Sequence, residues 1–133
     1  MPRKTFVGFG FGAIQAGLFL PEAYKQGFRM VVSEVVPGVV SAVNSQGSYS
    51  LNEATLKERL SRTIPGVELL NPADSDDLAK LVNALAEADV VATALPKVDF
   101  YDSAQGMPTV AQIMADGLGR NTNKVTVYTA ERV

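Results

Sequence analysis

The residues best suited to do chemistry are a cluster of glycines near the start of the chain and one acid that follows it. The cluster reads Gly10-Phe11-Gly12-Ala13-Ile14-Gln15-Ala16-Gly17, and Glu34 lies about 20 residues beyond it. Glycine lets a backbone turn tightly and approach a pyrophosphate, and the amides that open the next helix favour negative charge. An acid at the end of a second strand can accept hydrogen bonds from ribose hydroxyls. The pattern therefore indicates dinucleotide binding.

Two registers of the glycine motif compete. One is Gly8-x-Gly10-x-x-Ala13, and the other is Gly10-x-Gly12-x-x-Gln15-x-Gly17. We prefer the second register because it gives the first strand a fuller length, through Phe9. Gln15 then stands at the third position of the motif, where glycine usually allows the helix to pack closely on the strand. A glycine-rich turn that binds no nucleotide is the alternative interpretation, and Glu34 counts against it.

Bulk composition excludes several classes of function. The chain has 133 residues, no Cys, no His, a formal net charge of -2 and a pI near 5.1. This composition has no excess of positive charge that would indicate nucleic-acid binding. No apolar run reaches the roughly 18 residues of a membrane span. Without Cys or His, acid–base work would fall to Asp, Glu, Lys or Tyr. We expect a cytoplasmic protein with no metal site and no nucleic-acid or membrane partner.

The elements that must position the glycines and the acid alternate between strand and helix. Strands are expected at 5–9, 28–33, 90–95 and 124–129, and helices at 13–26, 39–45 and 109–118, with another that begins at Asp74 or Ser75. Parallel neighbours need right-handed crossover helices, so this order predicts a doubly wound, mainly parallel sheet. We expect a single α/β dinucleotide-binding domain over residues 1–133.

Some segments give weaker or conflicting signals. Pro21 lies inside the first helix and predicts a kink there. Residues 48–51 favour a short strand, whereas 52–59 stays open between loop, helix and strand. Pro65-Gly66 suggests a hairpin or a strand that returns on itself. The aspartates at 74, 76 and 77 resemble a metal site only superficially, because a helix N-terminus also favours acids.

Ligands of a doubly wound sheet bind beyond the carboxyl ends of its strands, which selects the remaining candidates. The turn at 93–96 is either a cofactor-facing turn or an ordinary strand stop. A polar loop with Lys97, Asp99, Tyr101 and Asp102 could line a pocket, although a solvated loop explains it better. The aromatic residues Phe9, Phe11 and Phe19 fit a core better than a base-stacking role. The candidate cofactor-binding residues are Gly10, Gly12, Ala13, Ile14, Gln15, Glu34, Thr93, Ala94, Leu95 and Glu131.

Five segments resemble, in order and spacing, the amino-terminal domain of mannitol-1-phosphate 5-dehydrogenase and the related mannitol dehydrogenases. They are 10–17, Ser33-Glu34-Val35, 48–51, 88–94 and Thr129-Ala130-Glu131. The resemblance implies a Rossmann-type domain that binds NAD and belongs to an oxidoreductase. That oxidoreductase would interconvert a polyol or its phosphate with a ketose or ketose phosphate. Glu34 stands where the family has the acid that selects NAD over its phosphorylated form.

The chain departs from the family in sequence and in length. Gln15 replaces a glycine that would hold the helix near the pyrophosphate, and Arg132 replaces an Asn beside the nicotinamide. Family members continue into a carboxyl-terminal domain with the catalytic Lys and its Asn and His partners. We therefore expect no catalytic residue here, an inactive chain on its own, and self-association through the face that the missing domain leaves open. A stand-alone nucleotide-sensing module and an interaction module without catalysis remain alternatives.

Overall fold

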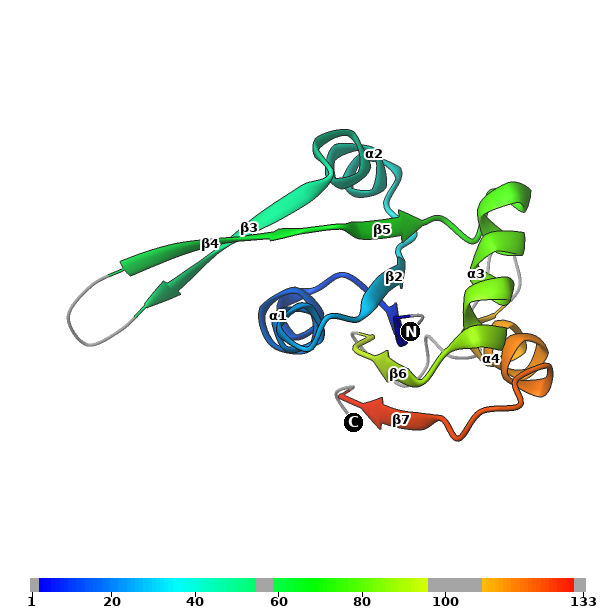
Figure 1. The fold of residues 1–133 in the computed structure, drawn as a ribbon. Helices are drawn as coiled ribbons and strands as arrows, with labels where there is room; N and C mark the ends of the chain where they lie inside the picture. Colours follow the sequence, from blue (N-terminus) through cyan, green and yellow to red (C-terminus); the bar gives the residue numbers. More distant parts are fainter. Residues whose placement is uncertain (1–2, 55–58, 96–108, 131–133) are drawn as a thin grey trace.

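The structure is a computed structural model that describes residues 3–54, 59–95 and 109–130. Its main element is a parallel sheet with the order β5-β2-β1-β6-β7. In Figure 1 these strands are stacked from β5 at the top to β7 at the bottom. Their bounds are β1 (Thr5–Phe9), β2 (Arg29–Ser33), β5 (Val67–Leu70), β6 (Val90–Thr93) and β7 (Thr126–Thr129). The expected parallel α/β sheet is confirmed.

The strand order reverses between β1 and β6. From β1 the chain moves outward to β2 and β5, and it then returns to build β6 and β7 on the other side. The carboxyl ends of β1 and β6 therefore diverge into connections that lead in opposite directions. This is the topological switch point at which doubly wound sheets bind ligands.

Helices cover both faces of the sheet. The first face carries η1 (Gln15–Phe19), α1 (Leu20–Lys25) and α2 (Pro37–Gln46), and the second carries α3 (Ser75–Glu87) and α4 (Val110–Gly119). Figure 1 shows α1 on the left of the strands and α3 and α4 on the right. Successive strand residues point to opposite faces, so Phe6 packs under α1 whereas Val7 packs under α3.

Side-chain caps explain where the two helices of the second face begin. Asp74 Oδ1 accepts hydrogen bonds from the N–H groups of Asp76 and Asp77, at 2.9 and 3.0 Å. Thr109 and Gln112 form a capping box at the start of α4. The aspartate cluster thus satisfies backbone donors of a helix that would otherwise have no acceptor.

The helical segment after the glycine turn, 13–25, contains a π-helical turn, η1, where the sequence predicted a kink at Pro21. The Leu20 N–H donates to the carbonyl of Gln15. Pro21 has no N–H, so the Ala16 carbonyl accepts from the hydroxyl of Tyr49 instead, at 2.5 Å. The proline changes the hydrogen-bond pattern, and a residue from a distant strand completes it.

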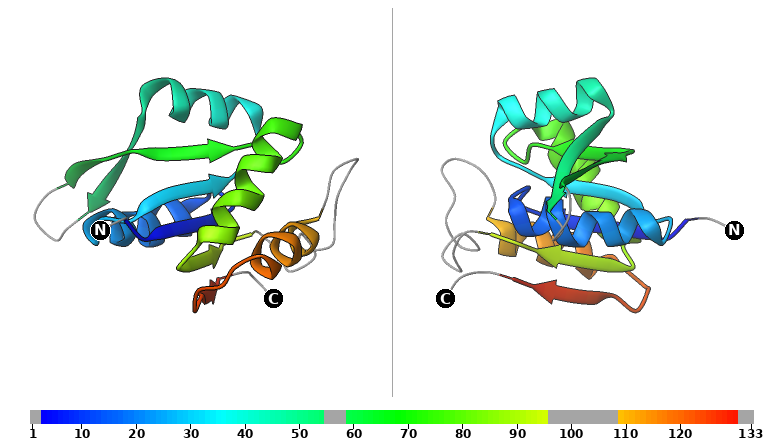
Figure 2. Two further views of the ribbon diagram at one scale, coloured as in Figure 1. Left: turned by 45° about the vertical axis from the view of Figure 1, so that its right-hand side comes forward. Right: turned by 90° about the vertical axis from the view of Figure 1, so that its left-hand side faces the viewer.

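An antiparallel ribbon joins α2 to the sheet. It consists of β3 (Ser48–Ala54) and β4 (Arg59–Pro65), and it extends away from the sheet in Figures 1 and 2. The hairpin suggested at Pro65-Gly66 is wrong, because β4 continues past Gly66 into β5 (Figure 1). Gly66 has a φ of 79°, and its N–H donates to the carbonyl of Gly47 at 3.0 Å. Of the residues left open at 52–59, residues 52–54 belong to β3 and Arg59 belongs to β4, while 55–58 lie outside the described residues.

Candidate cofactor-binding site

The turn after β1 requires glycine at position 10. Gly10 has a φ of 88°, in the left-handed region that side chains disfavour, and a Cβ there would lie 2.8 Å from the carbonyl oxygen of Ala94. Its N–H donates to the Ser33 carbonyl, and the Ala94 N–H donates to the Phe9 carbonyl, both at 2.9 Å. The turn is therefore tied to the ends of both neighbouring strands. β1 ends at Phe9, as the preferred register requires.

Gly12, by contrast, faces open space. A Cβ at Gly12 would meet no atom within 4 Å, and Gly12, Ala13 and Ile14 are all exposed. The Gly12 carbonyl accepts from the Ala16 N–H at 2.9 Å, so the helix begins directly after Gly12. The first N–H groups of a helix have no acceptor within the helix. This exposed helix start has the space and the donors for an anionic group.

Glu34 lies beside this turn and is bonded to it. One carboxylate oxygen, Oε1, accepts from the Phe11 N–H at 3.1 Å. The other, Oε2, accepts from the N–H groups of Val35 and Val36, at 2.7 and 3.2 Å. A carboxylate has about four lone-pair sites, so acceptor capacity remains for a hydroxyl group. The end of β2 therefore presents a fixed, partly buried acceptor next to the glycine turn.

The candidates after β6 divide between the core and the turn. Thr93 is fully buried, and its carbonyl accepts from the Ala130 N–H at 2.9 Å. Leu95 packs in the core cluster on the second face. The Ala94 backbone borders Gly10 most closely, and Leu95 Cδ2 would lie 3.6 Å from a Cβ there. Glu131 and the loop residues Lys97, Asp99, Tyr101 and Asp102 lie outside the described residues.

Gln15 points away from the open side of the turn. Its side chain is fully buried, and Nε2 donates to the carbonyls of Ala92 and Phe9, at 2.9 and 3.4 Å. It lies against Gly8 of β1, where a Cβ would be 2.6 Å from Nε2. Gly8 is thus a residue of the site that our preferred register left out. The only signal for it was the competing register.

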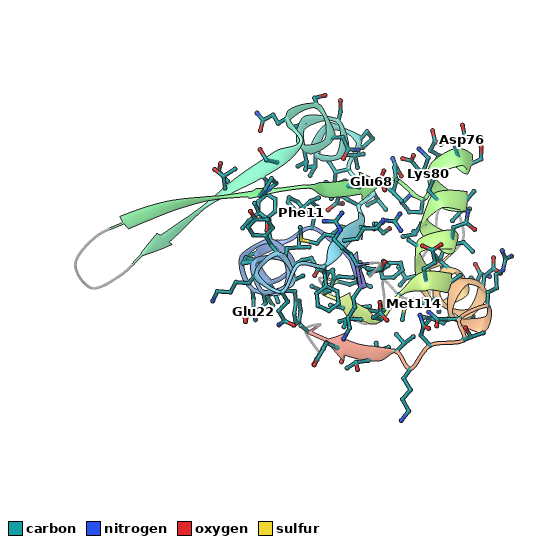
Figure 3. The ribbon with its side chains drawn as sticks, viewed as in Figure 1. Phe11, Glu22, Glu68, Asp76, Lys80 and Met114 are labelled. Carbon is teal, nitrogen blue, oxygen red and sulfur yellow. The ribbon has the colours of Figure 1, made fainter. Side chains whose placement is uncertain are left out.

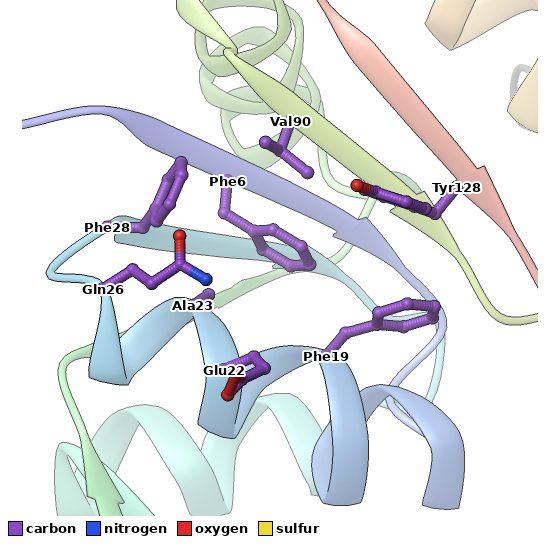
Figure 4. Close-up of a pocket in the computed structure, with 8 residues that line it drawn as sticks. All are labelled: Phe6, Phe19, Glu22, Ala23, Gln26, Phe28, Val90 and Tyr128. Atoms are coloured by element: carbon purple, nitrogen blue, oxygen red, sulfur yellow. The ribbon is translucent and has the colours of Figure 1, made fainter.

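The aromatic candidates pack against the body of the domain. Phe9 is fully buried. Phe11 meets Tyr49 edge to face with ring centroids 5.0 Å apart, close to where the ribbon joins the domain (Figure 3). Phe19 lies 6.2 Å from the Tyr128 ring, at one side of a mainly apolar cavity of about 210 Å³ (Figure 4). That cavity lies between α1 and the sheet face, away from the glycine turn.

Among residues 3–54, 59–95 and 109–130, no three His, Cys, Asp or Glu side chains group closely enough to bind a metal ion. None of the helices in those same ranges has the length and apolar character needed to cross a bilayer.

The chain matches a known family and several curated relatives. The model of the mannitol dehydrogenase Rossmann domain matches residues 4–129. The mannitol-1-phosphate 5-dehydrogenase of Lacticaseibacillus casei (strain BL23) is 31% identical over 113 residues, 84% of this chain and 27% of the relative. The mannitol-1-phosphate 5-dehydrogenase of Aureobasidium melanogenum is 29% identical over 95 residues, which cover 71% of this chain and 24% of the relative. The mannitol-1-phosphate 5-dehydrogenase of Talaromyces marneffei (strain ATCC 18224 / CBS 334.59 / QM 7333) is 24% identical over 141 residues, which cover 98% of this chain and 36% of the relative.

The family match agrees with the geometry described above. It covers all strands of the parallel sheet, the glycine turn and Glu34. The chain spans between 24% and 36% of the length of these three relatives, so it corresponds to one part of them. A Rossmann domain of this family implies a nucleotide cofactor. The chain belongs to the mannitol dehydrogenase Rossmann-domain family.

Proposed function

We propose that this chain is the NAD-binding domain of an oxidoreductase that interconverts a polyol or polyol phosphate and a ketose. The observation that carries the proposal is the Glu34 carboxylate, which is fixed beside the glycine turn by hydrogen bonds from Phe11, Val35 and Val36. An acid at the end of the second strand is the group that holds an adenosine ribose in such domains. Family membership and the exposed helix start support the same function.

The residues present fit NAD. The open space at Gly12 admits a pyrophosphate, and the amides of Ala13 and Ile14 at the helix start would bind its oxygens. Gly10 keeps the backbone close to β6, and Glu34 would accept a hydrogen bond from a ribose hydroxyl. When bound, NAD supplies the acceptor for a hydride. The protein's part is to hold and orient the dinucleotide at the switch point.

Glu34 also supports a preference for NAD over NADP. Its carboxylate is held in place on both oxygens, so it cannot swing away from an incoming group without losing these hydrogen bonds. A phosphate on the 2′-hydroxyl would bring negative charge against this carboxylate, and like charges at short range repel.

The substrate class follows from the relatives rather than from residues of this chain. The three relatives described above are named mannitol-1-phosphate 5-dehydrogenases. We infer that the substrate is a polyol phosphate or a related polyol, and that the catalytic residues lie outside residues 1–133. On this view the chain alone binds cofactor but does not catalyse the reaction.

Titration calorimetry with NAD and with NADP, on the wild type and on Glu34→Ala, tests the proposal. The variant should lose NAD affinity by about 1.5 to 3 kcal/mol for each charge-assisted hydrogen bond lost, and its preference for NAD should shrink. Glu22→Ala is the matched control, because the Glu22 side chain is 58% exposed on α1 and pairs only with Lys25 among the ion pairs described. Equal affinities for NAD in all three proteins would contradict the assignment.

A further inference from the structure

We propose that Gln15 and Gly8 form a reciprocal packing pair, and that Gln15 is the positioning residue that fixes the cofactor turn against β6. The family motif has glycine at the helix position and so lets the helix approach the strand. Here the helix carries the larger residue, and the strand carries the glycine. The packing part of this proposal stands on the structure alone, whereas the positioning part rests on the proposed NAD site.

The steric evidence is direct. A Cβ at Gly8 would lie 2.6 Å from Gln15 Nε2, 2.7 Å from Cδ and 3.1 Å from Oε1. Real Cβ atoms essentially never come within 3.0 Å of another atom, so a larger residue at position 8 would require the Gln15 amide to move. That amide is the end of a long side chain, but it is fully buried and hydrogen-bonded to two carbonyls, so moving it would break those bonds. Gly8 lies in the middle of β1, where glycine is otherwise unfavourable. Glycine is present at position 8 because the Gln15 amide needs the space that a side chain would fill.

The hydrogen bonds give the pair a second role. Gln15 Nε2 donates to the Ala92 carbonyl on β6 at 2.9 Å and to the Phe9 carbonyl at the end of β1 at 3.4 Å. The Phe9 carbonyl also accepts from the Ala94 N–H at 2.9 Å, and the Ala94 carbonyl is the group that limits position 10. One buried amide therefore joins the two strand ends that flank the switch point.

Gln15 connects these hydrogen-bonded strand ends to the start of the helix. It lies three residues after Gly12, in the first turn of the helical segment that opens the proposed pyrophosphate site. Its Oε1 is buried and accepts no hydrogen bond from any described group. Leaving an acceptor unpaired costs stability, and natural proteins tolerate such a cost mainly at functional sites. We infer that the amide is kept because its Nε2 fixes the helix start relative to the sheet.

A double-mutant cycle tests the packing pair without any cofactor. Thermal unfolding would be measured for Gly8→Ala, Gln15→Ala and the double variant. Gly8→Ala should lower Tm by about 3 to 6 °C, whereas the same change in the Gln15→Ala background should cost little, because the amide it would strike is gone. If Gly8→Ala does not fold but the double variant does, the pair is equally supported. Strictly additive changes in Tm would overturn it.

Gln15→Met tests the positioning role, because Met keeps most of the volume but donates no hydrogen bond. NAD affinity would be measured by calorimetry, and adenosine affinity by NMR titration. NAD binding should weaken about tenfold, the worth of one hydrogen bond, while adenosine binding, which does not use the pyrophosphate turn, stays within about twofold. Unchanged NAD affinity with a lowered Tm would overturn the positioning role, as would equal losses for both ligands.

The two ways of failing are distinguishable. If the wild type binds no NAD, the proposed function fails and the positioning role fails with it. The packing pair is still decided by the unfolding cycle, which uses no ligand. If the wild type binds NAD but Gln15→Met binds it equally well, the proposed function stands and only the positioning role is rejected.

Discussion

Gly12 and Gly17 occupy equally open positions on the helical segment, because a Cβ at either would meet no atom within 4 Å. No described residue therefore excludes a side chain at either position. The difference is that Gly12 immediately precedes the helix start, whereas Gly17 lies inside η1. The glycine that we propose lies against the ligand can thus be compared with an equally open glycine that does not, in the same protein.

Gly12→Ala should leave the stability of the free domain unchanged within about 0.5 kcal/mol, since the new methyl enters open space. It should nevertheless weaken NAD binding at least about tenfold, because the methyl stands where the pyrophosphate approaches. Gly17→Ala is the matched control. It should raise stability by about 0.5 to 1 kcal/mol, as expected within a helix, and leave NAD affinity unaltered. Equal NAD affinities for the two variants would argue against the assigned turn.

The sequence was sufficient to identify the residues of the turn but not how they pack. Gly10 and Glu34 could be placed at one turn because this placement depends on local conformation and on spacing along one βαβ unit. Gln15 was interpreted as a departure that would displace the helix, since its partner Gly8 lies on another element and only the folded structure brings them together. Thr93 and Leu95 likewise could not be placed, because burial at a strand end depends on the neighbouring strand and helix.

At the scale of elements, the crossing of α3 and α4 depends on a close contact between helices. A Cβ at Gly117 would lie 2.3 Å from Leu85 Cβ and 2.8 Å from its Cδ1. Leu85 Cβ is attached directly to the backbone of α3, so it cannot swing aside as the end of a long side chain can. The absence of a side chain at Gly117 therefore allows the two helices of the second face to approach.

Gly117→Ala should lower the free energy of unfolding by about 1 to 3 kcal/mol, the usual cost of overpacking a core. Gly119→Ala, two residues further along α4, is the matched control because a Cβ there would meet no atom within 4 Å. Chemical denaturation of the two variants would measure the difference. If Gly117→Ala proved as stable as Gly119→Ala, the described helix crossing would be incorrect.

Elements that depend on local signals were predicted well, and those that depend on distant partners were not. The caps at Asp74 and Thr109 involve residues only two or three positions further along the chain, so the helices after them could be predicted. The turn at Pro65-Gly66 was misread because the same residues can reverse a chain or carry it onward. What decides between them here is the pairing of β5 with β2. The π turn likewise depends on the Tyr49 hydroxyl, which arrives from β3.

In the molecule as a whole, four exposed apolar side chains lie in the segments that follow β1 and β2. Ile14 and Leu18 are 44% and 59% exposed on the helical segment, and Val35 and Val36 are 52% and 50% exposed after β2. Interdomain surfaces are partly apolar, and exposed apolar patches commonly mark such contacts. These four side chains give this part of the surface an apolar character that is suited to contact with another protein surface.

We expect the chain of residues 1–133 to self-associate through this surface. Sedimentation velocity over a range of concentrations should show a fraction of dimer that increases with protein concentration. Leu18→Lys should shift the equilibrium toward monomer, because it places a charge on the most exposed of these side chains. Lys80→Glu, a charge change on α3 of the opposite face, is the control and should have no such effect. A wild type that stays strictly monomeric at high concentration would contradict this expectation.

The proposed NAD site lies at the glycine turn beside Glu34. The most direct test is NMR titration of the isotopically labelled 14.2 kDa chain with NAD, residue by residue. Binding there should shift the amide signals of Gly12, Ala13, Val35 and Val36, with little change at Asn123 after α4. Shifts confined to the cavity around Phe19 and Tyr128, or no shifts at saturating NAD, would contradict it.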